Sequence, residues 1–282
     1  MIESIIFYFE NIPSSIRTVI LISGFTLLLL LENVEPLFEL KYKKLKHAIL
    51  NLFFTFTTLI INLSIASLIL GSSIYVSSNK LGIIYLFNLP IWANVCICLI
   101  VLDLIGAYFV HWLEHQVKWM WKFHLIHHTD TKVDVTTALR HHPGESILRA
   151  IFTILAIFIS GAPFGIVMLY QTISALFAQL THANINLPNY VERIMSYFIV
   201  TPNFHKIHHH NIQPLTDKNY GNIFSIWDHL FNTSTYIKNM DLITYGIDTH
   251  MKEHEHNNLL NLLAIPFQEY RPPIGSKFNN KK

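Results

Sequence analysis

Residues 111–128 contain the pentads His111-Trp112-Leu113-Glu114-His115 and His124-Leu125-Ile126-His127-His128, separated by eight residues. On a helix, side chains three and four positions apart share a face, so an i, i+4 pair can place two imidazoles on one metal ion. A trio at i, i+3 and i+4 can serve two neighbouring ions. The spacing therefore predicts a dinuclear metal site carried by helices.

Histidine is concentrated in the rest of the second half of the chain as well. The chain has 17 histidines, and all but His47 lie after position 110. Three more groups follow the pentads: Arg140-His141-His142-Pro143, His182 with Asn186, and His205-Lys206-Ile207-His208-His209-His210. So many ionisable groups near hydrocarbon are costly without a partner, and neutral imidazole is a preferred ligand of iron, zinc and copper. Metal binding explains the whole set.

The composition indicates an integral membrane protein. Hydrophobic residues make up 51% of the 282 residues and charged residues 13%, with a mean hydropathy of +0.37. Uncharged stretches cover 18–31, 48–79, 81–102 and 150–191, and all but the first reach the roughly 20 residues of a spanning helix. Gly161-Ala162-Pro163 interrupts the last stretch and predicts a hairpin with arms at 147–160 and 163–182, either two full spans or a re-entrant pair.

Basic residues predict the orientation in the membrane. The loop near Lys80 has only that charge, whereas the loop after the first stretch holds Lys41, Lys43, Lys44 and Lys46. Since cytoplasmic loops are rich in lysine and arginine, the lysine-rich loop and both histidine-rich regions are expected on the cytoplasmic side. The membrane would be the inner membrane of a bacterial cell or the endoplasmic reticulum of a eukaryotic one.

Charge and cysteine content exclude other classes of protein. The net charge of +2 is small and scattered, which argues against nucleic-acid binding. Cys96 and Cys98 lie in an apolar stretch and are expected to be buried thiols, so no disulfide framework is implied.

The histidine groups resemble the fatty-acid hydroxylase and sterol desaturase superfamily over roughly residues 95 to 235. Its three histidine boxes are matched by the pair in the first pentad, the trio in the second and a last H-x-x-H-H. The resemblance implies ten metal ligands: His111, His115, His124, His127, His128, His182, Asn186, His205, His208 and His209. Asn186 departs from the family, which has histidine there, and an amide oxygen binds metal more weakly or through water.

Two further segments carry the same resemblance. Arg140-x-His142-Pro143-x-Glu145 looks like the connector of the family, and Asn219-Tyr220-Gly221 followed by Trp227-Asp228 looks like its C-terminal signature, with departures at His229 and Asn232. We take His142 and Glu114 as the candidate catalytic residues, Glu114 acting as a partner that orients a ligand imidazole.

The resemblance implies an all-α membrane protein of about four transmembrane helices with a cytoplasmic helical cap, the metals lying between the two. It also implies two iron ions, which zinc can replace on overexpression, and molecular oxygen as co-substrate. Its substrate would be the C–H bond of a membrane lipid, hydroxylated or desaturated with electrons from a separate ferredoxin- or cytochrome b5-like protein. The expected domains are membrane anchor helices at 1–94, the catalytic domain at 95–235 and a cytoplasmic extension at 236–282.

Two other functions fit part of the pattern. His111-x-x-Glu114-His115 matches an inverted zincin, a zinc peptidase with glutamate as general base, but that leaves the H-x-x-H-H boxes without a role. A metal transporter or storage protein would also collect histidines, although transport sites lie near the bilayer midplane. We expect His250, His254 and His256, with Glu253 and Glu255, to form a polar surface stretch outside the site.

Overall fold

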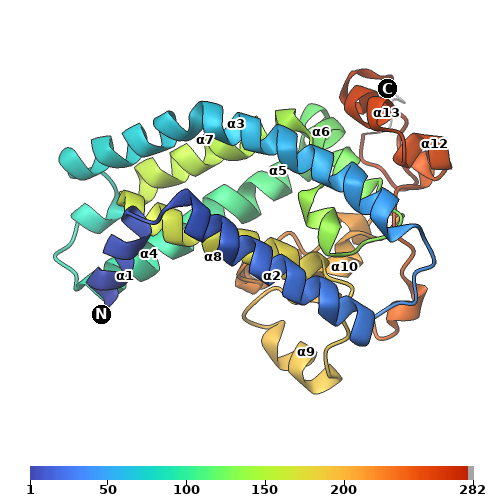
Figure 1. The fold of residues 1–282 in the computed structure, drawn as a ribbon, viewed down its shortest axis with the longest axis horizontal. Helices are drawn as coiled ribbons and strands as arrows, with labels where there is room; N and C mark the ends of the chain where they lie inside the picture. Colours follow the sequence, from blue (N-terminus) through green and yellow to red (C-terminus); the bar gives the residue numbers. More distant parts are fainter. Residues whose placement is uncertain (279–282) are drawn as a thin grey trace.

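The chain folds into a bundle of long helices that carries shorter helices at one end (Figure 1). The structure, a computed structural model, describes residues 1–278, which contain helices and turns but no β-strand. The all-helical fold expected from the sequence is confirmed. The end of the predicted 236–282 extension, residues 279–282, lies outside the described residues.

Within the described part of the chain, five helical stretches are long and apolar enough to cross a bilayer, where about four were expected. They are α2 (Ser14–Val34), α3 (Lys44–Ser78), α4 (Ile91–Asp103) with its continuation to Gln116, α7 (Pro143–Ser160) and α8 (Phe164–His182). Many outward side chains are apolar and exposed, such as Leu30, Leu63 and Ile151. This is the surface that a bilayer would cover.

The third of these stretches begins later and runs further than the expected segment at 81–102. Pro90 precedes the first turn of α4, and the chain before it turns through a short 3₁₀ helix, Ile83–Tyr85. After α4 the helix widens into a π-helical segment, Leu104–Phe109, and continues as α5 (Val110–Gln116). The charged Asp103 does not end the helix because Trp227 Nε1 donates a hydrogen bond to its buried carboxylate at 2.9 Å.

The hairpin expected around residues 161–163 is formed by α7 and α8. Gly161 ends α7 in the left-handed conformation, with φ 82°, and Pro163 precedes the first turn of α8. A side chain at Gly82 would lie 2.3 Å from the backbone nitrogen of Gly161, so the two inter-helix turns touch. Each arm is long enough to span a bilayer.

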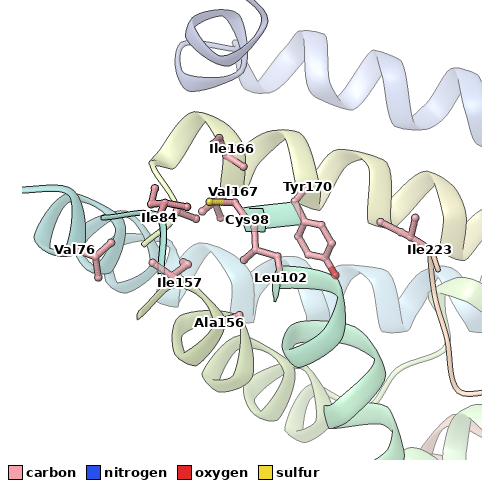
Figure 2. Close-up of a cluster of buried hydrophobic side chains, with 11 residues drawn as sticks. Val76, Ile84, Cys98, Leu102, Ala156, Ile157, Ile166, Val167, Tyr170 and Ile223 are labelled. Atoms are coloured by element: carbon pink, nitrogen blue, oxygen red, sulfur yellow. The ribbon is translucent and has the colours of Figure 1, made fainter. Parts of the chain in front are cut away.

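The core of the bundle is apolar and draws on α3, α4, α7 and α8. Figure 2 shows Leu102 and Tyr170 within this cluster, together with Ile157. Cys98 is buried in the same cluster, as expected, whereas Cys96 is exposed on the bundle surface. Both thiols are free.

The short helices lie mainly at the end of the bundle where α5 ends and α7 begins (Figure 1). At the other end lie α1 (Ile2–Glu10), where the carbonyl of Ile6 closely approaches Gly165 of α8, and the 3₁₀ helix Ile83–Tyr85 beside the Gly161 turn. The short α-helices are α6 (Lys118–His128), α9 (Asn189–Met195), α10 (Pro202–His208), α11 (Ile226–Leu230), α12 (Glu253–His256) and α13 (Leu259–Ala264). The further 3₁₀ helices are Val135–Leu139, Leu215–Asp217, Met240–Leu242, Asp248–His250 and Ile265–Phe267.

The expected polar surface stretch near the C-terminus is only partly at the surface. His254 and Glu253 are exposed, but His250, Glu255 and His256 are buried. Arg140 contributes to this burial, because its fully buried guanidinium donates to the carbonyl of His256 at 2.6 Å. This bond draws the C-terminal segment onto the loop after α6.

Candidate metal centre

Two groups of buried histidines form at the end of the bundle. In each group, one ligand atom per residue lies within 4.8 Å of all the others. The first group is His111, His115, His124, His128 and His208, and the second is His127, His182, His205 and His209. The structure therefore brings together nine of the ten residues predicted as ligands.

Helix geometry distributes these histidines between the two groups. α5 supplies an i, i+4 pair to the first group, while α6 sends two histidines to the first group and His127 to the second. α10 starts with Pro202 at its first turn. It also contributes to both groups, with His208 in the first group and His205 in the second. The groups adjoin, because the rings of His128 and His209 stack with centroids 4.9 Å apart.

The Nε2 atoms converge as the ligands of a metal would. His124 Nε2 lies 3.1 Å from Nε2 of both His111 and His128. In the second group, His182 Nε2 lies 3.0 Å from His127 Nε2 and 3.1 Å from His205 Nε2. Ligands at right angles around an ion, each ~2.1 Å from it, are separated by about 3.0 Å. The spacing suits two nitrogen-rich metal sites.

Several of these buried nitrogens have no hydrogen-bond partner among residues 1–278. They include Nε2 of His115 and His208 and both ring nitrogens of His209. Buried polar atoms are nearly always satisfied, so unpartnered nitrogens gathered in one place need a ligand. A metal ion in each group would supply it, and the residues present fit such ions.

The opposite ring nitrogens are held by the protein. His111 Nδ1 lies 2.7 Å from the carbonyl of Tyr220, His182 Nδ1 2.7 Å from that of Ala178, and His208 Nδ1 2.6 Å from that of Lys218. Nδ1–H donation to these oxygens leaves the Nε2 lone pair free for a metal, the arrangement usual around metal-bound histidine.

Burial keeps the imidazoles outside the spans uncharged. It holds the pKa of six of them well below the ordinary value, with further lowering by neighbouring histidines. These six are His124, His127, His128, His205, His208 and His209. Because a metal competes with protons for the same lone pair, neutral rings are ready to bind it at neutral pH.

Glu114 lies beside the first group but contacts an arginine. Its Oε2 accepts a hydrogen bond from Arg149 at 2.7 Å and lies 3.6 Å from His124 Nδ1. Arg149 also donates to Glu145 Oε1 at 2.9 Å, and that same oxygen lies 2.9 Å from His124 Nδ1. Glu145 therefore orients His124 directly, whereas Glu114 lies farther from the same ring nitrogen. The ion pair with Arg149 also weighs against Glu114 as the free base of a peptidase.

His142 does not join either group. Its Nδ1 accepts a hydrogen bond from Gly144 N–H and so caps the start of α7, and its ring packs on Phe123. The neighbouring His141 is closer to the centre: it stacks on His127 at 4.5 Å and lies 2.8 Å from Glu145 Oε1. The sequence does not indicate which of these two adjacent histidines faces the centre, because the backbone there is not yet helical.

Asn186 is exposed, whereas the histidines of the second group are buried. Its backbone N–H donates to the carbonyl of Glu35, within an antiparallel bridge between Pro36 and Ile185. The four histidines of the second group gather without it. The short bridge explains this, because an extended segment after α8 does not continue the helical i, i+4 spacing.

Two contributors could not be found from the histidine pattern. Asp217 accepts from His115 Nδ1 at 3.1 Å, and Lys277 lies 3.2 Å from its other oxygen. These two partners hold the pKa of Asp217 below its usual value despite burial, which raises it. Arg149 is the second contributor, and its i, i+4 spacing from Glu145 was the available sequence signal.

The C-terminal signature fixes a loop that contacts the metal centre. Asp228 accepts from the backbone N–H groups of Tyr220 and Gly221 at 2.8 and 2.9 Å, and burial raises the pKa of its carboxyl to about 6. The loop fixed in this way carries the carbonyl of Tyr220, which contacts His111. His229, which departs from the family pattern, stacks on Tyr197 and belongs to neither histidine group.

Comparison with known proteins gives a consistent result. Residues 95–233 match the fatty acid hydroxylase family. Alkylglycerol monooxygenase of Caenorhabditis elegans is 28% identical over 57% of this chain and 30% of that protein. Ornithine lipid hydroxylase OlsE of Rhizobium tropici is 28% identical over 45% of this chain and 38% of its own length. Human alkylglycerol monooxygenase is 30% identical over 50% of this chain and 30% of that protein.

The chain thus spans about a third of the length of the curated relatives that it matches. No solved structure matches it. The matched residues include both pentads, the His182 turn and the last histidine box, which together make up the two buried groups. Through residues 95–233, the chain belongs to the fatty acid hydroxylase family.

Proposed function

We propose that this protein uses molecular oxygen and two iron ions to oxidise a C–H bond of a membrane lipid. The observation that carries the proposal is the pair of adjoining groups of five and four buried histidines. A single ion cannot use nine imidazoles, and sites rich in imidazole with open positions suit iron that reacts with oxygen. Two of the relatives are named alkylglycerol monooxygenase and ornithine lipid hydroxylase, and both names agree with this chemistry.

Bound iron would supply oxygen activation, and the residues of the chain would hold and shield it. The carbonyls of Tyr220, Ala178 and Lys218 orient three ligand rings. Burial of all nine histidines keeps bulk water away from the reacting carbon. In a hydroxylation, one oxygen atom enters the C–H bond and the other leaves as water, which consumes two electrons and two protons.

The electrons must come from a reductant, and a separate ferredoxin- or cytochrome b5-like protein is the donor that we propose. For the substrate we propose a membrane lipid that reaches the site laterally. His111, His115 and His182 lie at the ends of apolar spans, so the centre sits where an acyl chain can reach it without crossing water.

We also propose that the centre faces the cytoplasm. His47, in the first turn of α3 beside the lysine-rich loop, lies 2.9 Å from Asp130, two residues after the second pentad. The lysines and the histidine groups are therefore at the same end of the bundle. An excess of lysine on that end favours the cytoplasmic side.

The proposal is tested by comparing lipids from cells that express the protein with lipids from cells that express the His128→Ala variant. The active protein should convert one lipid class to a product with an added oxygen atom or without a pair of hydrogens. The purified protein should consume oxygen only when a reductant and that lipid are both present.

Metal analysis separates the proposal from its rivals. Close to two transition-metal ions per chain are expected, whether iron or zinc acquired on overexpression. A single tightly bound zinc with proteolytic activity would support the peptidase. Vesicles that take up metal, with no change in any lipid, would support the transporter.

A further inference from the structure

Residues 259–267 form an almost entirely apolar segment outside the five spans. The segment reads Leu259-Leu260-Asn261-Leu262-Leu263-Ala264-Ile265-Pro266-Phe267 and comprises α13 and the 3₁₀ helix Ile265–Phe267. It lies in the stretch that the sequence assigned to a cytoplasmic extension. A surface segment in water would be expected to carry more polar residues.

One face of the segment anchors it to the bundle. Leu262 and Ile265 are buried in a cluster with Trp121 and Leu125 of α6 and Phe54 of α3. Leu259 and Leu263 pack against the same cluster, as does Leu50 of α3. The segment therefore lies against the site-proximal part of a spanning helix, beside α6 (Figure 1).

The opposite face is apolar and open. Leu260 is 77% exposed and Phe267 is 76% exposed. The outward face of α3 at this end is apolar too, with Leu45, Ile49 and Leu52 exposed. Exposed apolar side chains thus occur both on the segment and on the part of α3 beside it.

Contacts on two sides of the segment indicate how it would lie relative to the membrane. The ring of Phe267 lies 6.1 Å from that of Phe123 and 6.3 Å from that of His142, the residue that caps the first turn of the α7 span. On the polar side, Lys122 Nζ donates to the carbonyl of Gln268 at 2.8 Å, and Lys118 lies over the ring of Tyr270 at 5.0 Å. Apolar side chains at the start of a span, bordered by lysines, are the pattern of a segment lying in the membrane interface.

We propose that residues 259–267 insert into the headgroup and acyl boundary of the bilayer that the five spans cross. Leu260 and Phe267 enter the acyl region, and Lys118 and Lys122 stay at the level of the headgroups. The C-terminal segment is thus held from two sides, by the bilayer and by the Arg140 bond to His256. This inference does not depend on the oxidation chemistry.

The test places one fluorescent bimane label at a time in full-length protein reconstituted in phosphatidylcholine vesicles. Cys96→Ala removes the exposed thiol, while Cys98 is buried and stays unlabelled. Labels go on Leu260→Cys, on Phe267→Cys and on His254→Cys, the last an exposed polar position in the same C-terminal region. A nitroxide near the top of the lipid acyl chain should quench the first two labels several-fold more than the third, and aqueous iodide should do the reverse.

A second measurement uses the unaltered chain, so the test survives if a variant fails to fold. A phosphatidylcholine with a photoactivatable acyl chain should attach to the peptide containing residues 259–267 and not to the one containing His254. Iodide quenching at Leu260 and Phe267 equal to that at His254, with no lipid attachment, would overturn the inference. Cross-links from this segment to a second copy of the chain, in place of lipid, would overturn it as well.

Discussion

Individual imidazoles in this protein are oriented by what holds their second nitrogen. His124 is an example, because its Nδ1 lies 2.9 Å from Glu145 Oε1 while its Nε2 faces those of His111 and His128. Buried rings held in this way cannot turn toward water. The rings of His111, His124, His182 and His208 are held in this way, and each keeps its Nε2 directed toward its group.

Replacing His128 or His208 by alanine should collapse both metal content and lipid oxidation. Each change removes a nitrogen from the group of five and would leave the ligand set of that group incomplete. Metal per chain measured by mass spectrometry, together with oxygen uptake, checks this. His254→Ala is the control, because His254 is exposed and should leave both values unchanged. Loss of metal from the His254 variant with full retention in the His128 variant would place the site elsewhere.

The two carboxylates around Arg149 should differ in importance. Glu114→Gln keeps the bond between Arg149 and Glu145, so activity should fall by only about 10- to 100-fold, as for other residues that orient a ligand indirectly. Glu145→Gln should cost more, since Glu145 contacts both His124 and His141. Steady-state oxidation rates at matched metal content distinguish the two. A Glu114 variant that kept its metal and lost all turnover would instead indicate a general base.

At the scale of elements, a buried lysine joins α8 to α10. Lys206 of α10 donates to the carbonyl of His182, the last residue of α8, at 3.0 Å and to that of Val133 at 3.3 Å. Glu32 of α2 accepts from the backbone N–H of Asn184 just beyond α8. Burial lowers the pKa of Lys206 to about 8, and the nearby carboxylates oppose that shift.

Lys206→Met should therefore disturb the second histidine group more than the first. The change removes the hydrogen bonds of a buried cation to the carbonyls of His182 and Val133, each typically worth about 1.5–3 kcal/mol. We expect a lower thermal midpoint and a metal content that falls from two ions toward one. Lys218→Met is the matched control, because His208 contacts the backbone carbonyl of Lys218, which the change preserves. Equal metal loss in both variants would contradict the assigned role.

At the scale of the whole molecule, the polar ends of the spans meet at the histidine groups. A reporter fused to the C-terminus should be cytoplasmic, and one inserted beside Lys80 should be on the opposite side, because the lysine-rich loop and the centre share one end. Enzymatic reporters active on only one side of the membrane provide the measurement. Reporters that find both positions on the same side would invalidate the placement of the centre.

The metal-free protein should lose stability as the pH falls below about 6.5. Unfolded histidines take up protons near that pH, whereas burial keeps the pKa of His128, His205 and His209 lower in the folded state. Each such histidine lowers the unfolding free energy by up to about 1.4 kcal/mol per pH unit, and stability is insensitive to these groups above that range. Thermal midpoints in detergent between neutral and acidic pH check the slope. A midpoint that rose on acidification would show that the imidazoles are charged in the folded protein.

The sequence by itself determined the helical membrane fold, the family and the residues that form the two histidine groups. Each of these follows from local regularities: apolar length decides spanning, and i, i+3, i+4 spacing decides which side chains share a helix face. The hairpin at Gly161-Ala162-Pro163 was readable for the same reason, since glycine and proline act on the backbone where they stand.

Only the tertiary structure decided the rest. The selection of His141 over His142 and the exposure of Asn186 occur outside regular helices, where spacing says nothing about direction. His250 and His256 lie in short helices, and their burial depends on how these helices pack against the rest of the chain. Asp217 contacts His115, and Lys206 contacts the carbonyl of His182. The residues of each pair are more than twenty positions apart in the sequence and belong to different helices. Contacts of that kind depend on how whole elements pack, and packing is a property of the folded chain that no local pattern encodes.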